Sequence, residues 1–236
     1  MALEPGYKPR DWDIHPPVSN KTRDADNPRK PQQPMVPLPH TLSEITGPVH
    51  GHGALARDDH DLTRNAVRNG EPLGERMVVT GRVLDEDGRP LPGTLIEIWQ
   101  ANAAGRYAHD GDRHDAPIDP NFRGTGRCVT DEDGRYRFTT IRPGCYPLPH
   151  GDNSWRPAHI HYSLFGPSFV SRLITQSYFP GDPLLEFDTM YNSIPDKGAR
   201  DRLIATFDRD VGVRHYALGY VFDIVLRGRD ATPLES

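Results

Sequence analysis

The pattern of hydrophobic and polar positions changes near residue 75, where short apolar runs separated by turn residues begin. Residues 94–100 alternate between apolar and polar side chains, the period of a half-buried strand. A short helix is expected over residues 198–208. Further strands are predicted over residues 77–84, 128–130, 136–139, 159–165, 172–179 and 216–226. Many short strands joined by turns favour an all-β fold, an antiparallel β-sandwich with long loops and few short helices.

Two Asp-Glu-Asp-Gly turns interrupt these strands, at residues 85–88 and 131–134. Such a sequence favours a tight reversal of the chain. We therefore expect residues 94–100 to return alongside residues 77–84 as a hairpin. We expect residues 128–130 and 136–139 to form a second hairpin across the second turn. The recurrence of this turn between strands is explained better by common hairpin chemistry than by a repeat architecture.

Residues 1–74 contain many prolines and no sustained apolar period, so we expect an irregular arm. Scattered apolar residues such as Trp12 and Met35 favour an arm bound to the main domain or to a partner chain over a disordered one. Residues 41–48 predict a short capped turn. Residues 58–62, with aspartates at 58, 59 and 61, favour the start of a short helix, or else a hard-metal site or a solvated cluster. The predicted division is an arm over 1–74 and a main domain over 75–236.

Composition excludes several classes of protein. The formal net charge of −5 provides no basic face for nucleic acid, and no apolar run is long enough to cross a bilayer. The N-terminus lacks the basic and apolar regions of a secretory signal, and two cysteines make no disulfide framework. We expect a soluble cytoplasmic protein, with the roles of Cys128, Cys145 and His60 left open.

The candidate chemistry lies in two histidines, two tyrosines and an arginine. On a strand, His159 and His161 project from the same side, about 6.5–7 Å apart along the backbone, so both can reach one metal ion. Tyr146 precedes them by thirteen residues, and Tyr107 lies near the start of a long polar loop of the kind that usually carries function. A His-x-His pair by itself is weak, because many such pairs are packed or exposed histidines.

Several motifs, taken together, resemble the intradiol ring-cleaving dioxygenases. The similarity extends over nearly the whole chain and is greatest to the β chains that cleave protocatechuate. The motifs are residues 98–103, 105–107, 119–122, 126–127, 146–147, 155–161 and 222–228, with residues 39–48 and 59–62 in the arm. The resemblance implies one non-heme Fe(III) per chain, held by Tyr107, Tyr146, His159, His161 and a hydroxide.

The physical chemistry of these four side chains suits that ion. Fe(III) is hard and highly charged, so it prefers anionic oxygen, and imidazole completes its shell. Two phenolates and a hydroxide cancel three positive charges, which leaves no large uncompensated charge in a buried site. A zinc site on His159 and His161 is the alternative, which the paired tyrosines disfavour.

The resemblance also implies the reaction and the residues that surround it. Both atoms of O2 enter a catechol between its two hydroxylated carbons. Tyr146 matches the tyrosinate that leaves the metal and can accept a substrate proton. Arg156 would stabilise charge that develops on the ring, and Gln176 would support a ligand or the substrate.

The pocket wall departs from the family. Leu148 stands where tryptophan is frequent, and Met190 where isoleucine is common, so Leu148, Met190, Arg156 and Gln176 are the expected substrate contacts. A change of this size can alter substrate preference by about 1–3 kcal/mol. Protocatechuate is the first expectation, and other substituted catechols remain open.

The family pairs this chain type with a related α chain, which implies a hetero-oligomer. A homo-oligomeric relative acting on catechol or hydroxyquinol would carry a helical N-terminal segment, which the Pro-rich arm disfavours. From a different class, a non-catalytic transthyretin-like β-sandwich binding module fits residues 83–98 equally well. The joint presence of Tyr107, Tyr146, His159 and His161 favours the enzyme.

Overall fold

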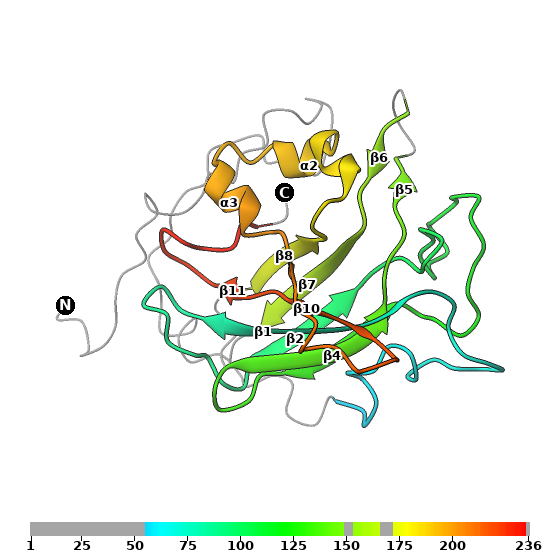
Figure 1. Ribbon diagram of the computed structural model, residues 1–236, viewed down its shortest axis with the longest axis horizontal. Coiled ribbons are helices and arrows are strands. Elements are labelled where there is room, and N and C mark those ends of the chain that lie inside the picture. The colour runs from blue at the N-terminus through cyan, green and yellow to red at the C-terminus, as the bar shows by residue number, and fades with distance from the viewer. Residues whose placement is uncertain (1–54, 149–152, 166–171, 235–236) are drawn as a thin grey trace.

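The computed structural model describes residues 55–148, 153–165 and 172–234 and contains two β-sheets with the hydrophobic core between them (Figure 1). One sheet has the order β11-β1-β10-β9, with β4 pairing the other edge of β1. Its strands are β1 (Arg76–Leu84), β4 (Arg135–Ile141), β9 (Thr206–Phe207), β10 (Leu218–Val221) and β11 (Ile224–Val225). The second sheet, of order β3-β2-β7-β8, consists of β2 (Leu95–Trp99), β3 (Thr125–Val129), β7 (His159–Phe165) and β8 (Arg172–Tyr178).

Smaller elements flank the sandwich. A two-stranded ribbon pairs β5 (Tyr146–Pro147) with β6 (Trp155–Arg156) and stands at the side of the second sheet (Figure 1). The helical elements named in the described part of the chain are η2 (Pro183–Glu186), α2 (Thr189–Asn192) and α3 (Lys197–Asp201). The predicted all-β sandwich with few short helices is confirmed. Most pairings are antiparallel, and β1 runs parallel to β10 and β11.

The C-terminal strand and the helix are shorter than predicted. The expected strand over residues 216–226 is divided into β10 and β11, which pair with successive parts of β1. The break falls at Asp223, whose carboxylate accepts the backbone N–H of Arg82. The expected helix over 198–208 stops at Asp201, because the following residues pair with β8 through an Ala205 N–H bond to the Tyr178 carbonyl.

The two predicted hairpins are wrong. β1 pairs with β4 and β2 pairs with β3, so each Asp-Glu-Asp-Gly turn carries the chain from one sheet to the other. The two turns instead lie together, and the N–H of Val83 donates to the carbonyl of Gly134. Local turn chemistry specifies a reversal, and burial of the two apolar faces selects the sheet that the next strand joins.

The helix predicted to begin at residues 58–61 is also wrong, because this segment forms turns. The Asp61 carboxylate accepts the N–H of Thr63, and Leu62 is fully buried in the core. The carbonyls of Asp59 and His60 accept N–H groups from β3 and β4 respectively. Residues 59–62, which belong to the predicted arm, therefore pack on the sandwich. The boundary at 75 stays a prediction, and the expected arm over 1–54, with its turn at 41–48, lies outside the described residues.

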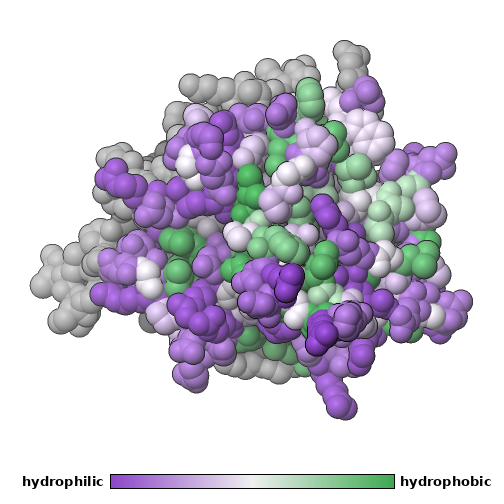
Figure 2. Space-filling view, viewed as in Figure 1, coloured by the Kyte–Doolittle hydropathy of each residue, from purple (hydrophilic) through white to green (hydrophobic). Residues whose placement is uncertain are grey.

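The face seen in Figure 2 is mostly hydrophilic, with hydrophobic residues in small separate patches. Large exposed apolar side chains include Leu73 and Phe187. Within the part of the chain that the structure describes, no helix is long and apolar enough to cross a membrane.

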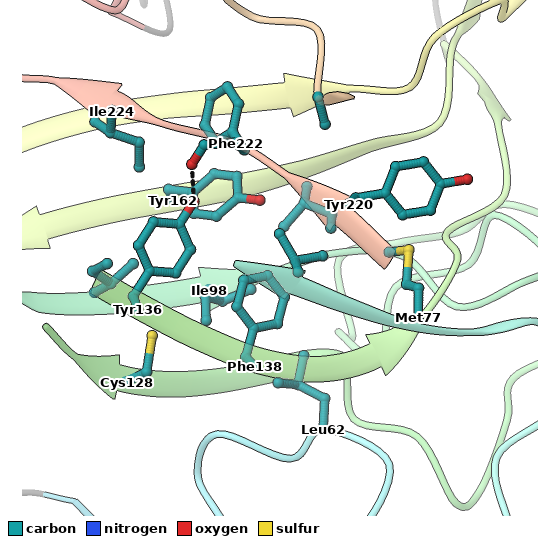
Figure 3. Packing of buried hydrophobic residues seen from close by; sticks show 14 of the residues in the cluster. Leu62, Met77, Ile98, Cys128, Tyr136, Phe138, Tyr162, Tyr220, Phe222 and Ile224 are labelled. Atoms are coloured by element: carbon teal, nitrogen blue, oxygen red, sulfur yellow. Dashed lines mark hydrogen bonds between the residues drawn. The ribbon is translucent and has the colours of Figure 1, made fainter. Parts of the chain in front are cut away.

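The core is rich in aromatic side chains from both sheets (Figure 3). Phe138 and Tyr162 meet edge to face, with ring centroids 6.1 Å apart. The Tyr136 hydroxyl donates to the carbonyl of Phe222 at 2.5 Å, which satisfies a polar group in an otherwise apolar interior. This packed interior lies beneath the second sheet, and the candidate site lies on the outer face of that sheet.

Candidate metal centre

The two histidines come from β7, an inner strand of the second sheet. Ile160, Tyr162 and Leu164 point into the core, so His159 and His161 point to the opposite face. That outer face is buried as well, with His159 only 1% exposed and His161 7%. Helices α2 and α3 cover part of it through a second apolar cluster that includes Tyr178 and Tyr191.

Tyr107 is held by hydrogen bonds within its own loop. The Asn102 side-chain oxygen accepts the N–H groups of Ala104 and Arg106, which folds the chain back just before the tyrosine. The Asp112 carboxylate accepts the N–H of Tyr107 at 2.8 Å. These buried and half-buried polar side chains fix the backbone from which the Tyr107 ring projects.

Tyr146 lies on β5, and two glycines bring its segment against the Tyr107 loop. The N–H of Gly144 donates to the Asn102 carbonyl at 2.9 Å. Gly105 has a φ of 81°, and a Cβ there would lie 2.1 Å from the Cys145 carbonyl oxygen. Only glycine permits this backbone conformation and this approach without strain. The two tyrosine rings consequently meet edge to face, with centroids 5.5 Å apart.

The four side chains predicted as ligands converge. The Tyr107 hydroxyl lies 3.1 Å from His161 Nε2, which lies 3.1 Å from His159 Nε2, and His159 Nε2 lies 3.3 Å from the Tyr146 hydroxyl. Two donors each about 2.1 Å from one ion are separated by about 3 Å when they meet it at right angles. Two phenolic oxygens and two imidazole nitrogens therefore fit a hard, trivalent first-row metal. Their assignment as iron ligands stays a prediction.

The histidine rings are oriented for metal binding. His159 Nδ1 bonds the Pro157 carbonyl at 2.7 Å, which places the proton on Nδ1 and leaves the lone pair of Nε2 directed at the other donors. Burial, with contributions from Arg156 and His161, lowers the pKa of His159 well below its usual value and keeps the ring neutral. His161 stacks on Trp99, with centroids 4.8 Å apart and planes 2° from parallel.

Arg156 lies opposite Tyr146 in the ladder between β5 and β6 and is 3% exposed. Its Nη2 donates to the Gln176 side-chain oxygen at 2.8 Å and to the Tyr178 hydroxyl at 3.2 Å. Its Nε lies 3.2 Å from the Asp188 carboxylate. Burial opposes the charge, but Tyr178 and Asp188 outweigh it and raise the pKa of Arg156 above its ordinary value. The guanidinium is a fixed cation beside the four donors.

The other predicted substrate contacts lie on β8, on α2 and just after β5. Gln176 pairs with His161 across β7 and β8, and its side-chain oxygen is engaged by Arg156. Met190 is 6% exposed, on α2. Leu148 is half-buried just after β5, and residues 149–152 lie outside the described part of the chain. Contact of these side chains with a substrate stays a prediction.

Sequence reasoning did not identify Trp99, Tyr178 or Asp188 as parts of the site. Trp99 and Tyr178 pair in register with His161 and His159 respectively, so strand register would have found them. Asp188 is invisible to that reasoning, because it caps α2 from a loop and meets Arg156 only through tertiary packing.

Comparison with known proteins matches residues 45–228 to the family model described as "Dioxygenase". The chain is 60% identical over 227 residues to the protocatechuate 3,4-dioxygenase beta chain of Burkholderia cepacia, covering 96% of each. It is 35% identical over 197 residues to the hydroxyquinol 1,2-dioxygenase of a Rhizobium species, covering 79% of this chain and 59% of that protein.

Solved structures give the same picture of the fold. The chain resembles hydroxyquinol 1,2-dioxygenase from Pseudomonas putida DLL-E4 with a TM-score of 0.53 and 26% identity, covering 72% of this chain and 61% of that one.

Proposed function

The chain belongs to the intradiol ring-cleaving dioxygenases, and from this premise we propose that it cleaves protocatechuate with O2 to 3-carboxy-cis,cis-muconate at a non-heme ferric centre. The observation that carries the proposal is the convergence of two phenolic oxygens and two imidazole nitrogens, with successive donors 3.1–3.3 Å apart. A transthyretin-like binding module would have no need for such a cluster.

Tyr107, Tyr146, His159 and His161 hold one ferric ion per chain. When bound, the ion would supply Lewis acidity, which would lower the pKa of the phenols that hold it and activate a catechol substrate toward O2. The protein provides a buried site with fixed donors. Burial lowers the pKa of His159 and keeps its ring neutral, and the Nδ1 bond to the Pro157 carbonyl leaves Nε2 as the metal-binding atom.

Tyr146 and Arg156 act on the substrate. Tyr146 takes a hydroxyl proton from the catechol as the substrate binds, which is general-base work at its phenolic oxygen. Arg156, held opposite Tyr146 on the neighbouring strand, presents a permanent positive charge that stabilises negative charge developing on the ring. Because the guanidinium is already buried and oriented, little reorganisation is needed during the reaction.

Leu148, Met190 and Gln176 contribute to the wall around the ring substituent. The catalytic domain spans residues 75–236, and the arm over 1–74 packs on that domain or on a related α chain in a hetero-oligomer. The relative from Burkholderia cepacia carries the name of a beta chain, which supports a partner of this kind. The partner completes the binding of the substrate carboxylate.

The test combines colour with oxygen uptake. Iron-loaded protein, with and without a co-expressed α chain, should show a visible tyrosinate-to-iron absorption band and should consume O2 with protocatechuate in a panel of catechols. Greater turnover with another substituted catechol would replace the substrate assignment. A colourless protein that binds no iron and consumes no O2 would overturn the enzyme reading in favour of a binding module.

Tyr146→Phe tests the assigned proton acceptor. We expect it to retain iron and lower kcat by about 100- to 10,000-fold, the usual range for a general base. Tyr216→Phe is the matched control, because Tyr216 is 46% exposed and shortly precedes β10 of the first sheet. Turnover of Tyr146→Phe at the parent rate would remove Tyr146 from that role.

A further inference from the structure

A buried carboxylate joins three separate elements behind the metal centre. Asp188 is 1% exposed and precedes α2. Its Oδ1 lies 3.2 Å from Arg156 Nε on β6, and its Oδ2 accepts the Tyr178 hydroxyl of β8 at 2.9 Å. Oδ1 also accepts the N–H of Met190 at 3.1 Å. One side chain thus contacts the arginine, a strand beside the histidines and the helix that carries Met190.

We propose that Asp188 is a positioning residue for ring cleavage, which orients the Arg156 guanidinium toward Tyr146 and couples that orientation to the placement of α2. The proposal rests on the function proposed above, because Arg156 acts on the substrate only in that reaction. A buried arginine without a carboxylate partner is costly and would turn toward other acceptors or toward water.

Asp188 contacts the Arg156 guanidinium at a different atom from the neighbouring side chains. Gln176 and Tyr178 both accept from Nη2 of Arg156, whereas the Asp188 carboxylate is an ion-pair partner that lies 3.2 Å from a second nitrogen, Nε. Contacts at two positions of a planar group fix its rotation, which one contact does not. Tyr178 accepts from Arg156 and donates to Asp188, which closes the network into a ring. Removing the Asp188 charge therefore loosens the arginine while its other partners remain.

The same carboxylate caps α2, and the two roles can be separated by substitution. Asn is as good a helix N-cap as Asp, so Asp188→Asn keeps an acceptor for the Met190 N–H while it removes the charge opposite Arg156. Asp196→Asn is the matched control, because Asp196 caps α3 through the N–H of Gly198 and is exposed.

The first measurement is turnover by the iron-loaded protein with its α partner. We expect Asp188→Asn to lower kcat by about 10- to 100-fold, the usual cost of losing a supporting partner at a metal site. The tyrosinate-to-iron band and the iron content should stay at parent values, and Asp196→Asn should match the parent in every respect. Parent turnover in Asp188→Asn would overturn the proposal.

A double-mutant cycle with Arg156→Gln supplies a readout besides activity. On the metal-free protein, each single variant leaves one buried charge unpaired and should lower the unfolding temperature. The double variant pairs two neutral groups and should lose less than the sum of the single losses. In kcat, Asp188→Asn should have no further effect once Arg156 is replaced.

Additive losses in the cycle, in either unfolding temperature or kcat, would show that Asp188 acts through α2 alone and would overturn the proposal. The cycle in unfolding temperature also distinguishes the two proposals. If the parent protein fails to consume O2, the proposed function fails, yet the coupling between Asp188 and Arg156 can still be measured.

Discussion

The two faces of β7 are both buried, yet they do different work. The inner face presents Ile160, Tyr162 and Leu164 to the apolar core between the sheets. The outer face presents His159 and His161 to a polar cluster completed by Tyr107 and Tyr146. The alternating direction of side chains along a strand usually separates a buried face from a solvent-exposed one. Here it separates an apolar interior from a polar one.

The difference follows from what covers each face. The inner face is closed by the other sheet, and tight packing of apolar side chains stabilises it. The outer face is covered by α2, α3 and the Tyr107 and Tyr146 segments, so its polar groups must be paired with one another. We expect changes on the inner face to reduce folding stability and changes on the outer face to reduce iron binding and activity.

Among the variants that compare the two faces, His161→Ala should have the largest effect on activity. Losing one of four donors should abolish the visible band and lower kcat by more than about 100-fold, beyond the range for residues outside the metal shell. The metal-free variant should unfold near the parent temperature. His60→Ala, at an exposed histidine, is the control. Strong destabilisation of metal-free His161→Ala would break the comparison between the two faces.

Leu164→Ala tests the inner face of the same strand. Leu164 is 1% exposed, and its truncation should lower the free energy of unfolding by about 2–5 kcal/mol. The folded fraction should retain iron, the visible band and the parent kcat per bound iron. Denaturant titration measures the first effect and absorbance the second. Loss of the band in fully folded protein would show that the two faces are not independent.

Gly105→Ala should affect both properties, because Gly105 sets how the two tyrosine segments meet. A methyl group would overlap the Cys145 carbonyl and force the segments apart, on top of about 1–2 kcal/mol for a left-handed backbone. Gly93→Ala is the control, since Gly93 has a φ of 69° with open space around it. We expect similar backbone strain in both variants and loss of iron only in Gly105→Ala. Equal iron content would exclude the close approach as a determinant of the site.

The smallest effect is expected at alkaline pH, from Cys128 on the inner side of β3. Burial raises the pKa of this thiol to about 12. The folded state keeps the proton while the unfolded thiol, with a pKa near its ordinary value of 9.0, loses it. Stability from this group is therefore complete below about pH 9 and declines as pH rises toward 12, by about 1.4 kcal/mol per pH unit.

Cys128→Val should remove that part of the alkaline loss. Unfolding free energies at pH 8 and pH 10.5 for the parent and the variant measure the difference. Cys145 is exposed and should react with a thiol reagent in the folded protein, whereas Cys128 should react only on unfolding. An identical pH dependence in parent and variant would contradict the assignment to Cys128.

Most of the strands were predictable from the sequence. The range predicted for β7 agrees with the structure, because β-branched and aromatic residues between turn signals specify extended backbone wherever they are packed. The two hairpins and the helix at residues 58–61 were wrong. A turn motif says that the chain reverses, but the choice of neighbouring strand depends on which apolar faces meet, and Leu62 is drawn into the core by such contacts.

By itself, the sequence determined that His159 and His161 share one face of a strand, because the two-residue period of extended backbone is local. It also specified the residue types that suit a ferric ion. Only the tertiary structure decided that Tyr107 and Tyr146 reach those histidines and that Asp188 meets Arg156. These contacts join residues 13 to 54 positions apart and depend on loop packing, close glycine contacts and helix placement, which no local pattern encodes.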